Sequence, residues 1–291
     1  MSTAVTAAPG WHRRWLRSLG VISVDARGRM GNAMFQLAFA HAASRRLGTS
    51  FVFGDAHLEE DFALGAWGRP QTRLARKLAF RARYGREGPK RVFVRDEEDP
   101  AEVLASLRDG VAYGGFFQSE RYFAGFEDAI RRLFIVRREH REAFVRRYGD
   151  LGRYLCMHVR RADYLQTGGW ALPTSWFHDA LATVGDRAGR QLIVISDDLP
   201  AVREELRDLE GARFEANPPL VDLQLLINAD VVIASNSSFS WWGAWLNEHA
   251  GARVLAPEHW VGFSRGVESP RDVIPPRWEQ VPVVDASLSA P

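Results

Sequence analysis

Short apolar runs alternate along this chain with longer segments whose apolar residues recur at helical spacing. Residues 21–26 form a β-branched run that ends in a turn containing Gly28 and Gly31, and residues 34–47 then show helical spacing. In the second half we expect the strands 154–159, 191–195, 231–234 and 253–256 and the helices 175–184, 199–209, 220–228 and 239–248. Alternation of this kind predicts an α/β fold in which parallel strands are joined by right-handed crossovers.

The clearest division of the chain lies just before the strands of the second half. Residues 129–148 are rich in Arg and are expected to be helical, and Gly149-Asp150 separates them from the strand that follows. We therefore expect an N-terminal α/β domain at residues 21–149 and a C-terminal α/β domain at residues 150–291. Residues 1–20 are expected to be a disordered or frayed N-terminus.

Composition and charge are those of a globular enzyme. The formal net charge of +2 argues against a dedicated nucleic-acid binder, since such proteins usually carry a strongly basic face. Lys77 and Lys90 are the only lysines among the 38 basic residues, and this preference for Arg indicates GC-rich coding and a bacterial source. Cys156 is the only cysteine, so no intrachain disulfide can form, and its apolar neighbours predict a buried thiol.

The first twenty residues contain neither an apolar run of membrane-spanning length nor the core of a signal peptide. We therefore expect a cytoplasmic protein. Residues 11–19 mix Trp, Arg and Leu, so peripheral contact with the inner face of a membrane is an alternative to a frayed terminus.

The most informative candidate chemistry lies at residues 155–164, Leu-Cys-Met-His-Val-Arg-Arg-Ala-Asp-Tyr. An apolar strand delivers His158, Arg160, Arg161 and Asp163 to one loop, and open α/β sheets bind ligands at the carboxyl ends of their strands. The planar fork of Arg makes paired hydrogen bonds to an anion with several oxygens and keeps its charge. The pattern favours a diphosphate site with its own acid and base groups; the alternative is a surface ion-pair cluster.

A second strand end carries two adjacent carboxylates. Asp197 and Asp198 follow the apolar run 192–195. A carboxylate there can accept paired hydrogen bonds from the N1 and N2 donors of guanine, or bind a ribose hydroxyl. The alternative is a helix N-cap, which suits Asp198 because Leu199-Pro200 comes next. Both interpretations can hold, because one Asp can cap the helix while the other binds a ligand.

A third strand end opens a Trp-rich helix with Ser237, Ser238 and Phe239. Hydroxyls and free backbone N–H groups at a helix N-terminus can hold a phosphate without a metal, whereas simple N-capping needs no ligand. Trp241 and Trp245 share one face of this helix, and both of them and Trp242 are expected to pack in the core and not to form a sugar platform.

Two other segments have plain structural interpretations. Around Gln118, the aromatic residues Phe117, Tyr122 and Phe123 are expected in the core, which leaves the polar Gln118 as the candidate ligand-binding residue. The acidic run 96–99 is expected to cap a helix and face solvent, because Asp99-Pro100-Ala101-Glu102 is a favourable helix start. No spacing typical of a zinc site occurs in the sequence, and we expect no metal.

Five blocks of the chain resemble, in the same order, the sequence blocks of the α-1,2-fucosyltransferases of glycosyltransferase family 11. Residues 158–164 resemble the HxRRxDY signature, and residues 236–247 resemble the NSSFSWWGAWL block, with which residues 236–246 agree throughout. The other similar blocks are residues 28–36 (GxxGNxxFQ), 115–123 (GYFQSxKYF) and 196–198 (SDD). Departures at Ala162, Ala33 and Leu37, where the family usually has Gly, Gln and Tyr, bear on loop shape and acceptor preference.

The resemblance implies a GT-B-like architecture, in which two Rossmann-like domains face a central cleft. The N-terminal domain would hold the acceptor and the C-terminal domain the GDP-sugar. It further implies inverting transfer of L-fucose from GDP-β-L-fucose to the 2-hydroxyl of an acceptor sugar, with galactose expected. The expected partners are GDP-fucose and a galactose-containing oligosaccharide or lipid-linked glycan of surface glycan biosynthesis. Beyond the donor substrate, no cofactor or metal is implied.

The resemblance also assigns roles to individual residues. Arg160 is expected to stabilise the charge that grows on the β-phosphate, supported by His158 and Arg161. Asp163 would orient the arginines or serve as the base, and orientation is favoured because a carboxylate beside two Arg is a weak base. Asn32, also in the expected catalytic set, and Gln118 would lie on the acceptor side. The expected donor-binding residues are His158, Arg160, Arg161, Asp197, Asp198, Ser237, Ser238 and Phe239.

Two other kinds of function stay open at this point. One is another nucleotide-sugar glycosyltransferase, including a metal-dependent one that uses the acidic run 96–99. The other is a protein that binds a glycan or a nucleotide sugar without turnover.

Overall fold

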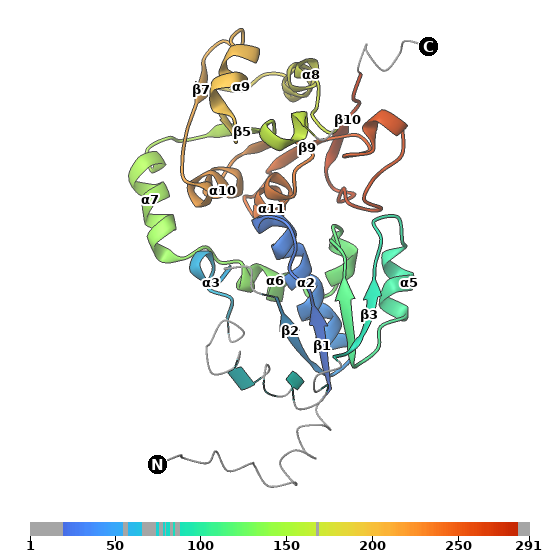
Figure 1. Cartoon of the computed structure of the whole chain (residues 1–291). Coiled ribbons are helices and arrows are strands. Elements are labelled where there is room, and N and C mark those ends of the chain that lie inside the picture. The colour runs from blue at the N-terminus through green and yellow to red at the C-terminus, as the bar shows by residue number, and fades with distance from the viewer. Residues whose placement is uncertain are drawn as a thin grey trace.

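Two parallel β-sheets, one from each half of the chain, organise the protein (Figure 1). The computed structural model describes residues 20–54, 58–65, 74–75, 78, 80–81, 84, 88–166 and 169–284. The predicted frayed terminus at residues 1–20 lies outside this part of the chain except for Gly20. The predicted α/β fold with parallel strands is confirmed. No helix of the described residues is long and apolar enough to cross a membrane.

The N-terminal sheet has the strand order β2-β1-β4-β3 in the part of the chain that the structure describes. Its strands, all parallel, are β1 (Val21–Val24), β2 (Ser50–Phe53), β3 (Lys90–Phe93) and β4 (Val111–Gly114). The chain runs from β1 to β2 at one edge of the sheet, and it then adds β3 and β4 on the other side of β1. A reversal of this kind leaves a crevice at the carboxyl ends of β1 and β4.

The C-terminal sheet has the order β10-β9-β8-β5-β6-β7 among the described residues. Its strands, also parallel, are β5 (Tyr154–Val159), β6 (Gln191–Ser196), β7 (Ala212–Phe214), β8 (Val231–Ala234), β9 (Arg253–Pro257) and β10 (Glu279–Val281). Here the order reverses between β5 and β8. In the register His158 is opposite Ile195 and Ala234, so β5, β6 and β8 end side by side. Ligands of open α/β sheets bind at such a point.

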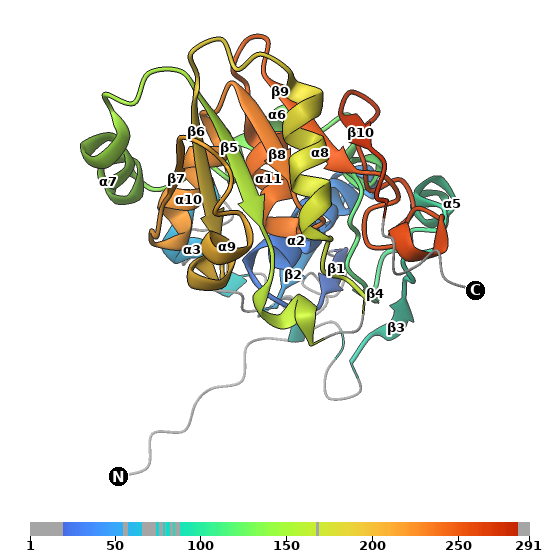
Figure 2. The same cartoon turned by 90° about the horizontal axis from the view of Figure 1, so that it is seen from above.

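Helices cover the C-terminal sheet on both faces (Figures 1 and 2). The helices α10 and α11 lie on the face toward the N-terminal half, and α8 and α9 lie beyond the opposite face. The helices described are α2 (Met30–Arg46), α3 (Leu58–Asp61), α5 (Pro100–Ala105), α6 (Glu127–Leu133), α7 (Arg138–Tyr148), α8 (Thr174–Val184), α9 (Leu199–Glu205), α10 (Pro219–Ile227) and α11 (Ser238–Leu246). Three 3₁₀ turns accompany them: η1 (Glu120–Phe123), η2 (Ala162–Leu165) and η3 (Phe263–Arg265).

Aromatic packing between α2 and α11 joins the two halves. The ring of Phe35 lies 4.4 Å from that of Trp241 and 4.9 Å from that of Trp242, measured between centroids. Trp241, Trp242 and Trp245 are almost completely buried, which confirms their predicted place in the core. Burial of such large side chains supplies much of the free energy that holds an interface together.

The backbones of the two halves come close together at Gly31 in the first turn of α2. A Cβ atom there would lie 2.6 Å from the carbonyl carbon of Ser238 and 2.8 Å from the backbone nitrogen of Phe239. The indole Nε1 of Trp242 donates to the carbonyl oxygen of Gly31 at 3.0 Å. Only glycine therefore allows the first turns of α2 and α11 to touch.

The Arg-rich segment 129–148, expected as one helix, is divided into α6 and α7 in the structure. Between them Val136 forms a β-bridge with Phe62, and the backbone nitrogen of Arg137 donates to the carbonyl oxygen of Asp61. Phe134 is buried and its ring packs against Trp242. Phe134 and Val136 are thus buried by the extended conformation at the break. The free energy gained by this burial outweighs what a continuous helix would gain from its backbone hydrogen bonds.

The contact at Gly31 gives the first prediction. Replacing Gly by Ala inside a helix normally stabilises it by about 1 kcal/mol. Gly31→Ala should instead lower the free energy of unfolding by about 1–3 kcal/mol, the usual cost of overpacking, because the new methyl group meets the backbone of α11. Denaturant unfolding of both proteins measures the difference, and an increase in stability would contradict the close contact.

Candidate active site

The carboxyl ends of both sheets border one cleft of ≈ 1240 Å³. The N-terminal half lines it with the turn after β1 and the segments after β3 and β4. The C-terminal half contributes the segments after β5, β6 and β8, the start of α10 and the chain between β9 and β10. The cleft therefore collects polar groups from several strand ends of each sheet.

Arg160, in the loop after β5, is held in place by two carboxylates. Its Nη2 donates to Asp163 Oδ1 at 2.6 Å, and its Nη1 lies 2.8 Å from Asp197 Oδ2. The side chain is only 12% exposed, and its guanidinium lies 5.3 Å from the ring centre of Tyr164. Because guanidinium has five N–H donors, the group can orient on these carboxylates and still donate to an anion in the cleft.

Arg161 has a different position from the one expected of a donor-binding residue. Its side chain is 3% exposed, and it pairs with Glu205 at 2.6 Å and donates to the carbonyl oxygen of Leu172 at 2.6 Å. Arg161 does not border the cleft. Successive side chains point in opposite directions at the end of an extended strand, so of the two arginines only Arg160 faces the cleft.

His158 borders the cleft but is deeply buried at the end of β5. Its Nδ1 lies 2.8 Å from Ser235 Oγ, and its ring packs near that of Phe239. Burial, with a smaller contribution from the Arg160 charge, lowers the pKa of His158 to about 3. The imidazole is thus neutral at pH 7, and it can offer a hydrogen bond to a ligand but no positive charge.

The N-terminus of α11 opens directly into the cleft. Ser237 caps the helix by accepting a hydrogen bond from the Phe239 nitrogen at 3.3 Å, and Ser237, Ser238 and Phe239 all line the cleft. Just before them, Asn236 is 1% exposed, and its Oδ1 has no hydrogen-bond partner among the described residues. Free N–H groups and the helix dipole make this end suitable for an anion.

The N-terminus of α2 reaches the same cleft from the opposite half. No side chain caps this helix, and its first turn contains no acidic residue. Gly28 has φ +79° and lies against the Asn32 side chain, so the turn requires glycine. Gln118 Nε2, from the segment after β4, donates to Asn32 Oδ1 at 2.7 Å. The expected acceptor-side residues are therefore in direct contact.

The two adjacent carboxylates after β6 differ in position. Asp197 lines the cleft. It accepts a hydrogen bond from the backbone nitrogen of Arg161 at 2.9 Å and forms an ion pair with Arg160. Asp198 caps α9 by accepting from the Ala201 nitrogen at 3.4 Å and does not border the cleft. Of this pair, only Asp197 has a position from which it could contact a nucleotide in the cleft.

Sequence reasoning missed a carboxylate in α10 that borders the cleft, Asp222. Its Oδ1 accepts a hydrogen bond from Asn217 Nδ2 at 2.9 Å. Burial nevertheless raises the pKa of the Asp222 carboxyl group to about 7.

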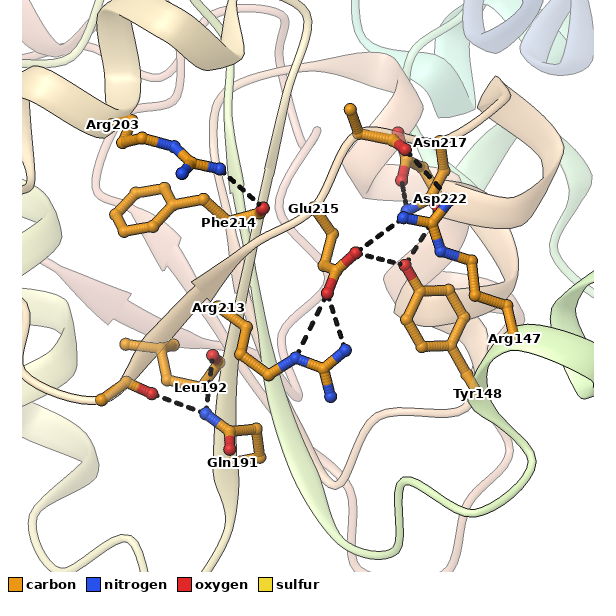
Figure 3. A network of polar contacts seen from close by, with 12 residues as sticks. Arg147, Tyr148, Gln191, Leu192, Arg203, Arg213, Phe214, Glu215, Asn217 and Asp222 are labelled. Atoms are coloured by element: carbon orange, nitrogen blue, oxygen red, sulfur yellow. Dashed lines mark hydrogen bonds and ion pairs between the residues drawn. The ribbon is translucent and has the colours of Figure 1, made fainter.

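Figure 3 shows the polar network around Asp222, in which Glu215 accepts hydrogen bonds from Arg147 and Arg213. The network ties α7 to the segment before α10. An acidic residue in the first turn of a helix looks like ordinary dipole compensation, so the sequence carried no distinct signal for Asp222.

The acidic run 96–99 is only partly accounted for by capping. Asp99 caps α5 by accepting from the Ala101 nitrogen at 2.8 Å, as predicted. Asp96, in contrast, lines the cleft and does not simply face solvent. No group of three or more His, Cys, Asp or Glu side chains suited to a metal ion occurs among the residues that the structure describes.

The sequence of this chain was compared with protein-family models and with known proteins, and it matches one family. The model described as Glycosyl transferase family 11 matches residues 110–278, more than half of the chain. An α-1,2-colitosyltransferase of Escherichia coli is 28% identical over 200 residues, which cover 64% of this chain and 67% of that protein. A galactoside 2-α-L-fucosyltransferase of Caenorhabditis elegans is 24% identical over 186 residues, which cover 58% of this chain and 52% of that protein. The matches thus span about half to two thirds of these relatives.

Among solved structures, POFUT1 in complex with GDP superimposes with a TM-score of 0.52 at 14% sequence identity. The match covers 81% of this chain and 98% of that chain. This likeness concerns the fold, and the expected GT-B-like architecture is confirmed.

The raised pKa of Asp222 predicts a pH-dependent cost in stability. The folded protein binds the Asp222 proton more tightly than the unfolded chain, so ionisation lowers stability progressively as pH rises from about 4 to about 7 and no further above that. Asp222→Asn removes this titration. The melting temperature of the variant should exceed that of the parent by little at pH 4.5 and by clearly more at pH 8.

The exposed Asp179 on α8 supplies the matched control. Asp179→Asn should change the melting temperature equally at both pH values. A gain for Asp222→Asn that shrinks toward pH 8 would contradict the burial of this carboxyl group.

Proposed function

The chain belongs to glycosyltransferase family 11, and we propose that it transfers L-fucose from GDP-β-L-fucose to the 2-hydroxyl of a galactose residue, with inversion. One observation carries this proposal. Arg160 and the N-termini of α2 and α11 converge on one cleft from both halves of the molecule. Such an arrangement suits a substrate whose diphosphate lies between a nucleoside and a sugar.

The diphosphate has cationic and dipolar partners on both sides of the cleft. Free N–H groups at the starts of α2 and α11 bind phosphate oxygens, and Arg160 adds a fixed charge. These partners supply the stabilisation that a metal ion provides in other glycosyltransferases, so we propose a metal-independent reaction. Ser237, Ser238 and Phe239 belong to this phosphate site in the proposal, and the neutral His158 contributes a hydrogen bond.

The nucleoside needs a carboxylate that can accept from guanine N1 and N2. We keep Asp197 for the donor side, where it also fixes Arg160. Asp222 is a second candidate for guanine itself, because its carboxyl is half-buried in the cleft and only one of its oxygens accepts from Asn217. Asp198 is better explained as the cap of α9.

The chemical problem is departure of GDP while the sugar acquires oxocarbenium character. Negative charge grows on the β-phosphate in this step, and preorganised donors aimed at that position lower the barrier. Arg160 has this role in our proposal, and Asp163 orients it through the 2.6 Å hydrogen bond. Arg29 lies 3.7 Å from the other oxygen of Asp163 and links this group to the acceptor side.

The acceptor side is assigned to Asn32 and Gln118. Their mutual hydrogen bond fixes the orientation of two amides that can bind sugar hydroxyls. The galactoside 2-α-L-fucosyltransferase among the relatives supports galactose as the acceptor. We propose that the enzyme works on the cytoplasmic side of surface-glycan assembly, on an oligosaccharide or a lipid-linked glycan.

One relative favours a second donor. The α-1,2-colitosyltransferase is the relative with 28% identity, and colitose is L-fucose without its 3-hydroxyl. A GDP-linked colitose is therefore the alternative donor, and the proposed phosphate chemistry would be the same for either sugar.

A nucleotide-sugar screen tests the donor and the metal. GDP and GDP-fucose should raise the melting temperature, UDP-sugars should not, and EDTA should leave turnover of GDP-fucose with a galactoside unchanged. NMR of the product should show fucose linked to O2. Activity that EDTA abolishes and Mn²⁺ restores would refute the metal-independent reaction, and a 3- or 6-linked product would refute the assigned linkage. Faster turnover of GDP-colitose would select the second donor.

Substitution of Arg160 tests its role at the leaving group. Arg160→Ala should lower kcat by about 10²–10³-fold, as expected when one preorganised charge-stabilising donor is removed. Arg160→Lys should restore little of this, because one ammonium cannot reproduce the planar fork.

The neighbouring Arg161 is the matched control. Arg161→Ala removes the ion pair with Glu205 and the hydrogen bond to the buried Leu172 carbonyl, and it should lower the free energy of unfolding by about 1–3 kcal/mol, with a smaller effect on kcat of the folded fraction. Near-normal turnover by a well-folded Arg160→Ala protein would contradict the assignment.

A further inference from the structure

The cleft has two ends that differ in their chemistry. Figure 1 shows α3, α7 and α10 on one side of the molecule and β3 and α5 on the other. Asp61, His140 and Asp222 border the cleft on the first side, and Asp96 and Gln118 belong to the second. A donor whose nucleoside lies toward α10 therefore directs its sugar toward the second end.

Asp96 lies three residues beyond β3, at the carboxyl edge of the N-terminal sheet. Its carbonyl oxygen accepts a hydrogen bond from the Arg271 nitrogen at 2.8 Å, and Arg271 also pairs with Asp99. The segment that carries Arg271 comes from the C-terminal half. Asp96 is thus fixed at a junction of the two halves and is not part of a free loop.

The other acidic side chains of this run have structural partners or are exposed. Glu98 accepts from the Arg95 nitrogen, Asp99 caps α5, and Glu97 is exposed. For Asp96, no Lys, Arg or His nitrogen of the described residues lies within 4 Å of the carboxylate. Burial, and secondarily the charge of Glu97, raise its pKa. A carboxylate in these surroundings is a better proton acceptor than one paired with Arg.

The charged groups around Asp96 come from several elements. Glu97, Glu98 and Asp99 lie on its own segment, the Tyr122 hydroxyl comes from η1, and Arg271 and Asp272 come from the chain between β9 and β10. Burial raises the pKa of Tyr122, and the charges of Glu98 and Asp96 raise it further. Tyr122 is therefore protonated in the neutral range, and it does not compete with Asp96 as a base.

A series of contacts relates Asp96 to the leaving-group site. Arg160 contacts Asp163, and Asp163 lies 3.7 Å from Arg29 in the turn after β1. The same turn leads to Asn32, which accepts from Gln118 after β4, and β3 is the next strand of the sheet. Along the N-terminal sheet, the strand that leads to Gln118 lies between the strands that lead to Asn32 and to Asp96, whereas Arg160 follows a strand of the other sheet. In an inverting transfer the acceptor attacks the anomeric carbon opposite the leaving group, so a base and a leaving-group residue from different sheets suit this reaction.

Other titratable groups of the cleft are less suited to removing the acceptor proton. Asp163 and Asp197 both pair with Arg160. His158 is a weak base because burial lowers its pKa to about 3. Asp61 lies beside His140 at the opposite end of the cleft, together with Asp222.

We propose that Asp96 is the general base that takes the proton of the acceptor hydroxyl, an inference that rests on the proposed fucosyl transfer. In this step the acceptor oxygen forms a bond to the anomeric carbon, and the bond from that carbon to the β-phosphate oxygen breaks. The bonding electrons leave with GDP, and the acceptor proton moves to an Asp96 oxygen. Asp96 later releases this proton to solvent, so no other reactant is needed.

The test compares an acceptor that must lose a proton with one that need not. With GDP-fucose and a galactoside, Asp96→Asn should reduce kcat by about 10²–10⁴-fold, the usual contribution of general base catalysis. With azide ion as the acceptor, the same variant should form α-L-fucosyl azide at a rate near that of the parent. The dissociation constant of GDP should change by less than about twofold, because Asp96 lies at the acceptor end. Glu97→Gln, at the exposed neighbouring carboxylate, should leave all three measurements unchanged.

Each outcome has a distinct meaning. Near-normal galactoside transfer by Asp96→Asn would overturn the role of Asp96, and so would an equal loss of galactoside and azide transfer. If Asp96→Asn does not fold, Asp96→Glu carries the same comparison, since it keeps a carboxylate and should lose galactoside transfer more than azide transfer. Absence of GDP-fucose turnover by the parent protein would instead refute the proposed function, which is measured first.

Discussion

The contact between Gly31 and the first turn of α11 is the constraint on which the rest of the site depends. A hydrogen atom is the only side chain that fits between α2 and the backbone at Ser238. The hydrogen bond from Trp242 to the Gly31 carbonyl fixes the same point from the other helix. Because the contact joins the first turns of two helices, it also brings their free N–H groups to one cleft. The packing of the halves and the opening of two helix N-termini into one cleft therefore have one cause.

The groups of this cleft that favour an anion do not depend on a titration near neutral pH. Arg160 keeps its charge, and helix dipoles are independent of pH. His158 is neutral because it is buried at the end of β5. The carboxylates beside Arg160 reduce its net charge, yet they also restrict its orientation. A diphosphate, which brings more than one negative charge and several acceptor oxygens, uses both properties: a fixed direction of approach and donors from two helices.

Much of this arrangement could be predicted from the sequence. The apolar runs at β5 and β8 predicted the strand limits, and the blocks around Arg160 and Ser237 predicted the main residues of the cleft. The local sequence pattern could not predict features that depend on tertiary contacts between residues far apart in the chain. Arg161 is adjacent to Arg160, yet only the position of Glu205 shows that it turns away. The break between α6 and α7 depends on a bridge to Phe62, which is distant in sequence. The division of the chain into acceptor and donor domains stays a prediction.

The carboxylates of the cleft separate into two groups by their surroundings. Asp163 and Asp197 contact Arg160, whereas burial raises the pKa of Asp96 and Asp222. Pairs of titratable groups with opposed environments are characteristic of acid–base sites. Burial without a cationic partner costs stability in the free protein, and the buried Oδ1 of Asn236 adds an unmet hydrogen bond. Sugar hydroxyls and nucleobase N–H groups are donors that can satisfy such oxygens. The Oδ1 of Asn236, which has no hydrogen-bond partner among the described residues and belongs to the lining of the cleft, is thus well placed to distinguish a bound substrate from water.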